Sequence, residues 1–597
     1  MRFNLGTGSG LHAKRCASVL AALMAVAFVS LAFSEDAEEP TDSDPPTGSI
    51  VVDVAQLRKL DSSCPEPTVK QGSQCVLTGD ITISQTLSIA PFTHLNCQGH
   101  RILAATPGTM DSTGNATPSE PRIAILGLGS QGVKIQNCFI GDDKGTPDDI
   151  TDDALFQNAI VLLDSKIPAT WDPNAPGYPG ALALSRNKVL GNHIYSSLVG
   201  ILGIGIDNTE IKDNTLGFGG IWVYRNSAHI SIVHNAIKAP LFAAGTYVPR
   251  FPPGAATSVP GLSLDTPYVP ASFQASIAIL AANMTSLINI VSNAQLLAQF
   301  PLDASNRLSD ITIDGNTIEQ KTGSRIEPIR IQYLEDSTIS NNVIHIAGTS
   351  SANASVSGIT AFSQVSTSKV TIPGKCTLNT ARYCVTKADC DLAPIQEGGN
   401  GDCAGTSAVD FYASDNVVFE NNFIDGDLST GGNQSAGIVC INETNARIEG
   451  NTIIGRGRGT GIRLDSKNAL ETAIVMRNYV SNVSFGLHLR QANNAPNLAA
   501  FFGAHVSLND ITGSTTRAIR ADLPDGTSFP FKAELSDMSR GNHWGRSCAD
   551  SDGFRDFNEP DANGKKDSPS SLVTDSHPYG FPVANVFDET FLNQVCK

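Results

Sequence analysis

The sequence carries little charge, and most of that charge is negative. Only 17% of its 597 residues are Asp, Glu, Lys or Arg, and the formal net charge is −17. This balance argues against a nucleic-acid partner, because binding a polyanion requires a basic surface. With so few charges, most exposed positions must be Ser, Thr, Asn or Gly. Such a surface suits polar, neutral partners such as sugars.

Several metal motifs are also missing. The chain has no C-x-x-C pair of the kind that would favour a zinc site. It lacks the Met/His/Cys clusters that copper would require, which argues against a copper-handling role.

The N-terminal residues predict export. Lys14 and Arg15 precede an apolar run from Ala17 to Phe33, and Ala32-Phe33-Ser34 suits signal-peptidase cleavage. We therefore expect a signal peptide over residues 1–34 and an acidic disordered linker over residues 35–50. The mature protein would be secreted, extracellular or periplasmic, with no membrane span after cleavage. An uncleaved anchor is the alternative, although the run is short for a span.

A short motif, Asn-x-(Ile/Leu/Val/Phe), recurs along most of the chain. Its copies begin at Asn137, Asn192, Asn214, Asn235, Asn316, Asn342, Asn422, Asn451, Asn478 and Asn509. Where no long insertion intervenes, they lie 21 to 31 residues apart. A core unit of about 22 residues with variable insertions indicates a solenoid.

Each unit reads as three short strands, one before the Asn, one just after it, and a third that often begins with Gly. Within each strand the apolar residues alternate, as in a strand with one buried face. Strands this short need stacked neighbours to cover that face. We expect the Asn to occupy a left-handed corner, with its amide bonded along the axis as a ladder.

These units resemble the repeats of right-handed parallel β-helix proteins of the carbohydrate-binding and sugar-hydrolase (CASH) or NosD-like kind. The stretches THLNCQGHRI and GVKIQNCFI resemble opening coils, and GNHWG at residues 541–545 resembles the end of a NosD-like repeat region. The resemblance implies an all-β, pectin-lyase-like fold: a right-handed parallel β-helix of about ten coils over residues 51–545. It does not fix the function, because this fold hosts lyases, hydrolases, epimerases and plain binders.

Two insertions are expected, at about residues 241–305 and 371–405. In the first, Phe273, Ile277, Leu280, Met284, Leu287 and Val291 are spaced like the stripe of an amphipathic helix. The second contains Cys376, Cys384, Cys390 and Cys403, which we expect to form two disulfides of undecided pairing. Further expected bridges are Cys64–Cys75 and Cys548–Cys596. Cys97 and Cys138 either pair across adjacent coils or stack as small buried groups.

The candidate site follows from the strand alternation. If Ile462 and Leu464 point inward, their neighbours point outward and form ladders over successive coils. The candidate catalytic residues are Arg463, Asp465, His488 and Arg490. The candidate substrate-binding residues are Arg520, Asp522, Arg330, Gln332, Trp222 and Tyr224. Arg would bind carboxylates, His would abstract a proton, and the aromatic rings would receive a sugar. A ladder that merely balances charge on an exposed sheet is the alternative.

The C-terminal tail or cap, residues 546–597, holds two Asp/Asn/Gly patterns 11 residues apart. Their oxygen-bearing residues are Asp550, Asp552, Asp556, Asp561, Asn563 and Asp567. Hard oxygen ligands around a Gly turn suit a structural Ca²⁺, the one cofactor that the sequence suggests. A polar turn cluster without metal is the alternative.

Two functions stay open at this point. The first is a secreted, monomeric β-helix protein that binds an acidic polysaccharide on one sheet, and that cleaves it as a lyase or glycoside hydrolase if it is an enzyme. The second is a non-catalytic surface or scaffold protein. The second draws support from missing motifs, since the chain lacks the catalytic sets of polygalacturonases, mannuronan epimerases and pectate lyases.

Overall fold

A computed structural model describes the strands of residues 57–522 and a few residues beyond. The described residues are 57–60, 68–71, 74–89, 93–111, 116–128, 132–146, 149, 151–163, 186–224, 227–239, 258–259, 262–263, 275–280, 308–321, 325–347, 355–362, 370–372, 374–377, 383–384, 402–404, 407–409, 414–428, 435–441, 443, 445–466, 473–491, 505–522, 533–534, 542 and 573–574. The expected signal peptide, the linker and the six tail residues proposed for Ca²⁺ lie outside them.

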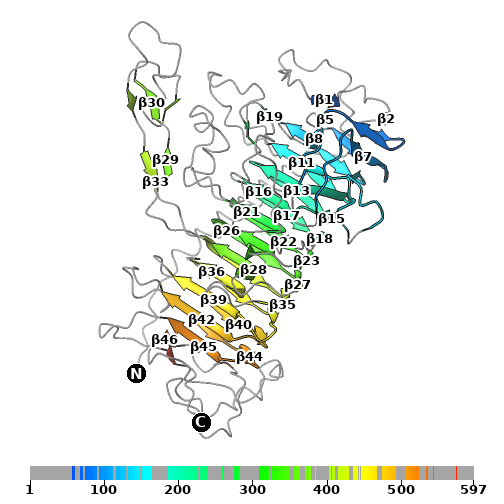
Figure 1. The fold of residues 1–597 in the computed structure, drawn as a ribbon. Helices are drawn as coiled ribbons and strands as arrows, with labels where there is room; N and C mark the ends of the chain where they lie inside the picture. Colours follow the sequence, from blue (N-terminus) through cyan, green and yellow to red (C-terminus); the bar gives the residue numbers. More distant parts are fainter. Residues whose placement is uncertain are drawn as a thin grey trace, which may run out of the picture. The chain divides into compact units, whose positions relative to one another are not determined.

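The described strands wind into a right-handed parallel β-helix, as the repeat predicts (Figure 1). One coil consists of β14 (Asp207–Lys212), β15 (Thr215–Phe218) and β16 (Ile221–Tyr224). Each of these pairs in parallel with its counterpart in the next coil, β17 (Ala228–Val233), β18 (Ala236–Ala239) and β21 (Ile277–Leu280). The right-handed sense is the one that connections between parallel strands almost always take.

Three faces result, which we call sheets A, B and C. Sheet A contains β5 (Thr86–Ile89), β8 (Ile123–Leu128), β11 (Phe156–Leu163), the end of β13 (His193–Ile204), β16, β21, β25 (Ile329–Ile331), β28 (Ser355–Phe362), β36 (Ala436–Ile441), β39 (Thr460–Ser466), β42 (Phe485–Gln491) and β45 (Arg517–Asp522). Sheet C contains β4 (Ile81–Ile83), β7 (Arg101–Ala104), β10 (Phe139–Ile140), the start of β13, β15, β18, β23 (Thr317–Lys321), β27 (Val343–Ala347), β35 (Phe423–Gly426), β38 (Thr452–Ile454), β41 (Tyr479–Ser481) and β44 (Asp510–Thr512).

Sheet B has 13 strands among the described residues, a few more than the ten or so coils expected. They are β2 (Thr68–Gln71), β3 (Gln74–Leu77), β6 (His94–Asn96), β9 (Lys134–Gln136), β12 (Lys188–Leu190), β14, β17, β22 (Leu308–Asp314), β26 (Leu334–Ser340), β34 (Asp415–Glu420), β37 (Arg447–Glu449), β40 (Ile474–Met476) and β43 (His505–Ser507). Only β2 joins antiparallel, to β3. Strand β1 (Leu57–Leu60) pairs with β5, and β24 (Arg325–Ile326) pairs with β28.

A single core fills the space between the three sheets. Its residues come from the inward positions of every coil, and they include Ile462 and Leu464 of β39 with Leu487 and Leu489 of β42. The inward alternation predicted from the sequence is therefore confirmed on these strands. Since the side-chain period of a strand is two, the residues between them are committed to the outer face.

A ladder of buried Asn side chains runs along the corner between sheets B and C. In each step the Nδ2 of one Asn donates to the Oδ1 of the next, at 2.8 to 3.0 Å, from Asn192 through Asn509. Asn542 of the GNHWG motif adds the last step. The predicted ladder is confirmed, and it leaves these buried amides bonded to one another and to backbone carbonyls.

One detail of the corner differs from the prediction. The left-handed backbone belongs to the residue before the ladder Asn, as at Asp213 (φ 55°) and Asn421 (φ 54°). Asn137 itself occupies this left-handed position (φ 55°) and is exposed, so the ladder position of its coil is Cys138. Asn, Asp or Gly occupies this corner in most coils and tolerates it readily, whereas His234, Arg477 and Leu508 take the same left-handed backbone in three others. The following Asn supplies the amide that bonds along the axis.

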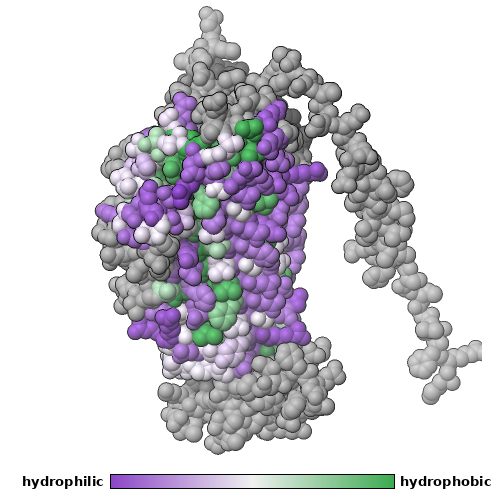
Figure 2. All heavy atoms as spheres, turned by 90° about the vertical axis from the view of Figure 1, so that its right-hand side faces the viewer, coloured by the Kyte–Doolittle hydropathy of each residue, from purple (hydrophilic) through white to green (hydrophobic). Residues whose placement is uncertain are grey.

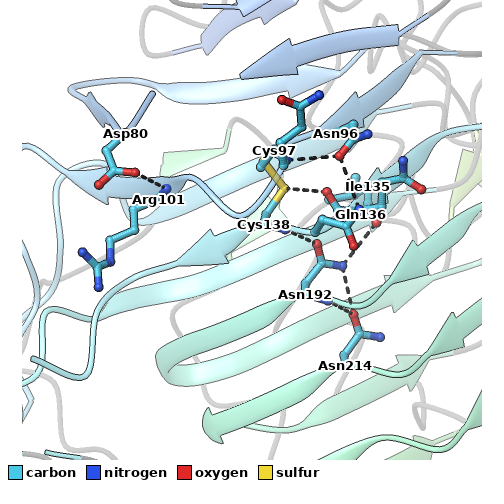
Figure 3. Close-up of a disulfide and its surroundings, with 11 residues drawn as sticks. Asp80, Asn96, Cys97, Arg101, Ile135, Gln136, Cys138, Asn192 and Asn214 are labelled. Carbon is cyan, nitrogen blue, oxygen red and sulfur yellow. Dashed lines mark hydrogen bonds between the residues drawn. A yellow bond between two sulfur atoms is a disulfide. The ribbon is translucent and has the colours of Figure 1, made fainter. Parts of the chain in front are cut away.

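A disulfide continues the line of the ladder toward the N-terminal coils (Figure 3). Cys97 and Cys138 are bonded to each other, and the backbone N–H of Cys138 donates to Oδ1 of Asn192 at 3.0 Å. Of the two arrangements expected for this pair, bonding across adjacent coils is confirmed. Cys75 is disulfide-bonded as well, while Cys64, its expected partner, lies outside the described residues.

Glycine begins many sheet A strands because two backbones approach closely there. A Cβ on Gly461 would lie 2.2 Å from Cγ1 of Val480 and 2.6 Å from the carbonyl oxygen of Gly486. A Cβ on Gly486 would lie 2.0 Å from Cγ2 of Ile511. A side chain at either position would therefore collide with the core of the next coil.

The prediction of a helix in the first insertion is wrong in the first half of the expected stripe. Ile277–Leu280 form strand β21 of sheet A, and Ile277 and Ile279 are buried in the core. Over so short an apolar stretch, helical spacing and a strand cannot be told apart by periodicity. The remaining residues of the expected stripe lie outside the described part of the chain.

Short antiparallel pairs lie apart from the three sheets. They are β19 (Ser258–Val259) with β20 (Leu262–Ser263), β29 (Val370–Ile372) with β33 (Ser407–Val409), and β30 (Gly374–Cys376) with β31 (Tyr383–Cys384) and β32 (Cys403–Ala404). A parallel pair joins β46 (Ala533–Glu534) to β47 (Val573–Thr574). In the Cys-rich insertion, Cys376 and Cys403 are register partners. The predicted disulfides of this insertion remain a prediction.

The side of the solenoid that carries the ends of β15, β18, β23 and β27 is mainly hydrophilic (Figures 1 and 2). A narrow, interrupted band of apolar residues runs along it (Figure 2). On sheet C, the rings of the register partners Phe139 and His193 stack, with centroids 4.3 Å apart. Within the described ranges, no helix is long and apolar enough to cross a membrane.

Candidate functional site

The predicted site residues lie in two adjacent columns on the outer face of sheet A. Strand register aligns Arg463 of β39 with His488 of β42 and Arg520 of β45. Towards the N-terminal coils, the same column passes through Val439, Thr360, Arg330, Ala278 and Trp222. A neighbouring column aligns Asp465, Arg490 and Asp522. The stacking of Arg, His and Asp that the sequence predicts is therefore present.

The column is largely buried, which the sequence did not predict. Arg463 is 1% exposed, Asp465 1% and His488 3%, although all three lie outside the solenoid core. Upstream residues of the column, Leu202 and Val439, are equally buried outside that core. The outer face of sheet A is thus covered along this column. In the last coils the burial is less complete, since Arg520 in this column and Arg490 in the neighbouring one are half-buried.

Arg463 and Asp465 form a buried ion pair at the centre of the cluster. Nη2 of Arg463 donates to Oδ2 of Asp465 at 2.7 Å, and Nη1 of Arg490 lies 3.6 Å from the same oxygen. Nε and Nη1 of Arg463 and Oδ1 of Asp465 are buried and have no hydrogen-bond partner. Each such group carries a desolvation cost of about 1–3 kcal/mol, so these three atoms mark a place where a polar ligand would be stabilised.

Three positively charged side chains lie near the buried carboxylate of Asp465. Burial lowers the pKa of Arg463, the adjacent Asp465 carboxylate opposes that shift, and the positive charges of Arg490 and Arg520 add to it. An Arg side chain does not lose its proton in practice. The guanidinium of Arg463 therefore stays charged in a buried place, which carries a desolvation cost.

Aromatic groups join the cluster at its accessible end. The guanidinium carbon of Arg520 lies 5.1 Å from the ring centroid of Phe485, and the rings of Phe485 and His488 are 6.5 Å apart. The cation over the ring is in range for a cation–π interaction. Phe485 was not among the predicted site residues. Its position at the start of the same Gly-containing strand was the signal that could have found it.

The candidate residues in the coils nearer the N-terminus are less exposed than predicted. Trp222 is 5% exposed, and its Nε1 donates to the carbonyl oxygen of Ala275 at 3.1 Å, so it presents no open ring to a sugar. Arg330 is 6% exposed and forms a buried ion pair with Glu327, a residue that sequence reasoning missed. Gln332 is half-buried. Tyr224 and Asp522 end β16 and β45, and their side chains lie outside the described part.

No metal centre emerges from the parts of the chain described here. No three His, Cys, Asp or Glu residues among them converge closely enough to hold an ion. The calcium prediction for the tail is untested, because Asp550 to Asp567 fall outside these residues. The cluster on sheet A is built from guanidinium, imidazole and carboxylate groups.

The fold defines the class of the protein: a right-handed parallel β-helix, which carries a buried cluster of Arg, His and Asp side chains on the outer face of sheet A. No family model matches the chain, and the comparison with curated proteins finds no match.

Several solved structures are similar to the chain at low identity. One is the Dettilon tailspike protein gp208, with a TM-score of 0.36 and 11% identity over 75% of this chain and 61% of that one. Another is the periplasmic alginate epimerase AlgG, with a TM-score of 0.28 and 11% identity over 78% and 81%. A third is the family 28 exopolygalacturonase of Yersinia enterocolitica, with a TM-score of 0.27 and 9% identity over 76% and 72%. At these identities the likeness concerns the fold alone.

Proposed function

We propose that this is an exported β-helix protein that binds an acidic polysaccharide through the cluster of Arg463, His488, Arg490 and Arg520. One observation carries the proposal: two N–H groups of a buried Arg have no acceptor, beside two further Arg side chains. The Cys97–Cys138 disulfide supports an oxidising compartment outside the cytoplasm.

The chemistry of the cluster favours a carboxylate over a neutral group. The guanidinium of Arg463 offers adjacent N–H donors in the planar geometry that a carboxylate accepts. Beside them, Oδ1 of Asp465 has no hydrogen-bond partner and would accept a hydrogen bond from a hydroxyl group of the same ligand. A sugar acid presents both groups together. Half-buried Arg490 and Arg520 would receive the polymer first, and the buried groups would be reached only by a shift of what covers sheet A.

Binding can be measured by calorimetry with oligosaccharides of uronic acids and with a neutral oligosaccharide of the same length. We expect Arg490→Gln and Arg520→Gln each to weaken uronate binding by roughly 10-fold or more, the loss of about one charge-assisted hydrogen bond. Arg447→Gln on sheet B, where the side chain is 49% exposed, is the matched control and should leave affinity unchanged. Absence of binding to every uronate polymer would reject the proposal.

An enzymatic version of the proposal assigns His488 as the base that removes the proton next to the uronate carboxylate. His488→Ala should then abolish release of unsaturated uronate products, followed by ultraviolet absorbance, while uronate binding persists. The polysaccharide would be cleaved by β-elimination, with Arg463 stabilising the charge that develops on the carboxylate. Equal product release by wild type and His488→Ala would contradict this role.

A non-catalytic scaffold or surface protein is the second candidate. It is favoured by the burial of His488 at 3% exposure and Arg463 at 1%, since a reacting group must meet its substrate. Uronate binding without turnover, unaffected by His488→Ala, would support this candidate over the enzyme.

A further inference from the structure

The loop between β10 and β11 concentrates negative charge next to a buried carboxylate. Residues 141–154 read GDDKGTPDDITDDA and contain six Asp and one Lys. Asp153 is only 7% exposed, and its Oδ1 is buried without a hydrogen-bond partner. An unpaired carboxylate oxygen in such a place is costly unless something neutralises it. The repeat pattern assigns this loop no role, and the polysaccharide site proposed on sheet A does not include it.

Backbone pairing brings Asp143 and Asp153 opposite each other. Asp142 and Ala154 form an antiparallel bridge through two N–H···O=C bonds of 3.0 and 2.8 Å. Asp143 and Asp153 are the next residues outward from this bridge, and in an antiparallel pair residues at these positions lie on one face, opposite each other. Tyr195 of β13 donates its hydroxyl to Oδ2 of Asp143 at 3.0 Å. Oxygen atoms from two segments of the chain thus converge here.

The positively charged side chains near Asp143 and Asp153 form ion pairs with a different carboxylate, that of Asp142. Lys144 lies 3.3 Å and Arg101 3.7 Å from oxygens of Asp142. Among the residues that the structure describes, no Lys or Arg forms an ion pair with Asp143 or Asp153. Thr146 donates to Asp152, and Thr151 donates to Asp149, so these hydroxyls do not reach Asp153 either.

The electrostatic surroundings agree with this geometry. Burial raises the pKa of Asp153 to about 7, with further contributions from the charges of Asp152, Asp143, Asp149 and Asp142. Burial, followed by the charge of Asp143, likewise raises the pKa of Tyr195.

We propose that Asp143 and Asp153 form the base of a binding site for a hard divalent cation of the calcium type, which fastens the β10–β11 loop to β13. Calcium accepts carboxylate, carbonyl and water oxygens in a flexible sphere. Because no three carboxylates converge among the described residues, backbone oxygens and water supply the remaining ligands. The site is separate from the one predicted for the tail and does not depend on the proposed polysaccharide binding.

The test is thermal unfolding of the full chain with Ca²⁺ or with a chelator, at a pH about one unit above the pKa of Asp153. Asp153→Asn is the test variant, and Asp149→Asn, an exposed Asp of the same loop, is the matched control. Wild type and Asp149→Asn should gain several degrees from Ca²⁺, whereas Asp153→Asn should gain little. A variant with Asp550→Asn and Asp552→Asn should keep this gain, which separates the loop from the tail.

Without Ca²⁺, the ionisation of Asp153 should make the stability of the fold depend on pH. A carboxyl whose pKa is raised in the folded state destabilises the fold progressively as pH rises from 3.8 towards about 7. Without Ca²⁺, Asp153→Asn should therefore unfold at a higher temperature than wild type above pH 7 and at the same temperature near pH 4. Calorimetry in two buffers should show proton release on Ca²⁺ binding below pH 7 but not well above it. A wild type that gains nothing from Ca²⁺, or an Asp153→Asn that gains as much, would overturn the proposal.

Discussion

Replacing Asn422 with Ala should destabilise the protein by about 3–5 kcal/mol. The Oδ1 of Asn422 accepts the backbone and side-chain N–H of Asn342, at 3.1 and 2.9 Å. Its Nδ2 donates to the carbonyl of Ile339 and to Asn451, both at 2.9 Å. The change removes four buried hydrogen bonds and leaves their buried partners without these bonds. Chemical unfolding followed by circular dichroism measures the loss.

Asn421→Gly is the matched control for this change. Asn421 is the exposed, left-handed residue directly before Asn422 (φ 54°), and Gly accepts that backbone conformation without strain. Its free energy of unfolding should change by less than about 1 kcal/mol. If Asn422→Ala were no more destabilising than Asn421→Gly, the ladder would contribute little to stability. Since coils contact only their neighbours, the loss should also appear as faster amide exchange in the coils around Asn422.

Asp465→Asn should cost about 3–5 kcal/mol, because it leaves the Arg463 guanidinium buried without its counter-ion. The pair is almost inaccessible, with side-chain exposures of 1% and 2%, so solvent cannot replace the lost charge. The double variant Arg463→Met and Asp465→Leu should recover most of the loss, since it buries no charge. Urea unfolding of the three proteins measures the coupling.

Asp425→Asn provides the comparison on an exposed face. Asp425 lies on sheet C, 38% exposed and 3.8 Å from His345, and its pair should contribute less than about 1 kcal/mol. A loss at Asp465 as small as that at Asp425 would show that the cluster on sheet A is solvated in solution. In that case uronate would bind to an open outer face of sheet A and not to a covered one.

The fold could be predicted from the repeat because every coil contains the same short sequence pattern. Asn214, Asn235 and Asn316 each precede a strand whose apolar residues alternate, and each takes the place in the ladder that this spacing implies. Alternation also placed Arg463 and His488 outside the core, since a strand can turn only every second residue inward. The helix expected around Ile277 was wrong because its four-residue strand is too short for periodicity to distinguish.

For the candidate site, the sequence predicted only which residues on neighbouring strands are aligned. Register follows from stacking the Gly-containing strands, so the meeting of Arg463, His488 and Arg520 could be predicted from three short segments. The partnership of Arg330 with Glu327 could not, because it depends on how the chain enters β25. Nor could the pairing of Asp143 with Asp153, which a bridge across a turn brings together.

By itself, the sequence determined the winding of the chain: corner amides stacked along one line, apolar side chains inside, and a line of Arg and His on one outer face. Only the tertiary structure decided that Trp222, Arg463 and His488 are buried on that outer face. The reason is physical. Which side of a strand a residue takes depends on its immediate neighbours, whereas its exposure depends on what lies over that strand, and this is settled by segments far away in the chain.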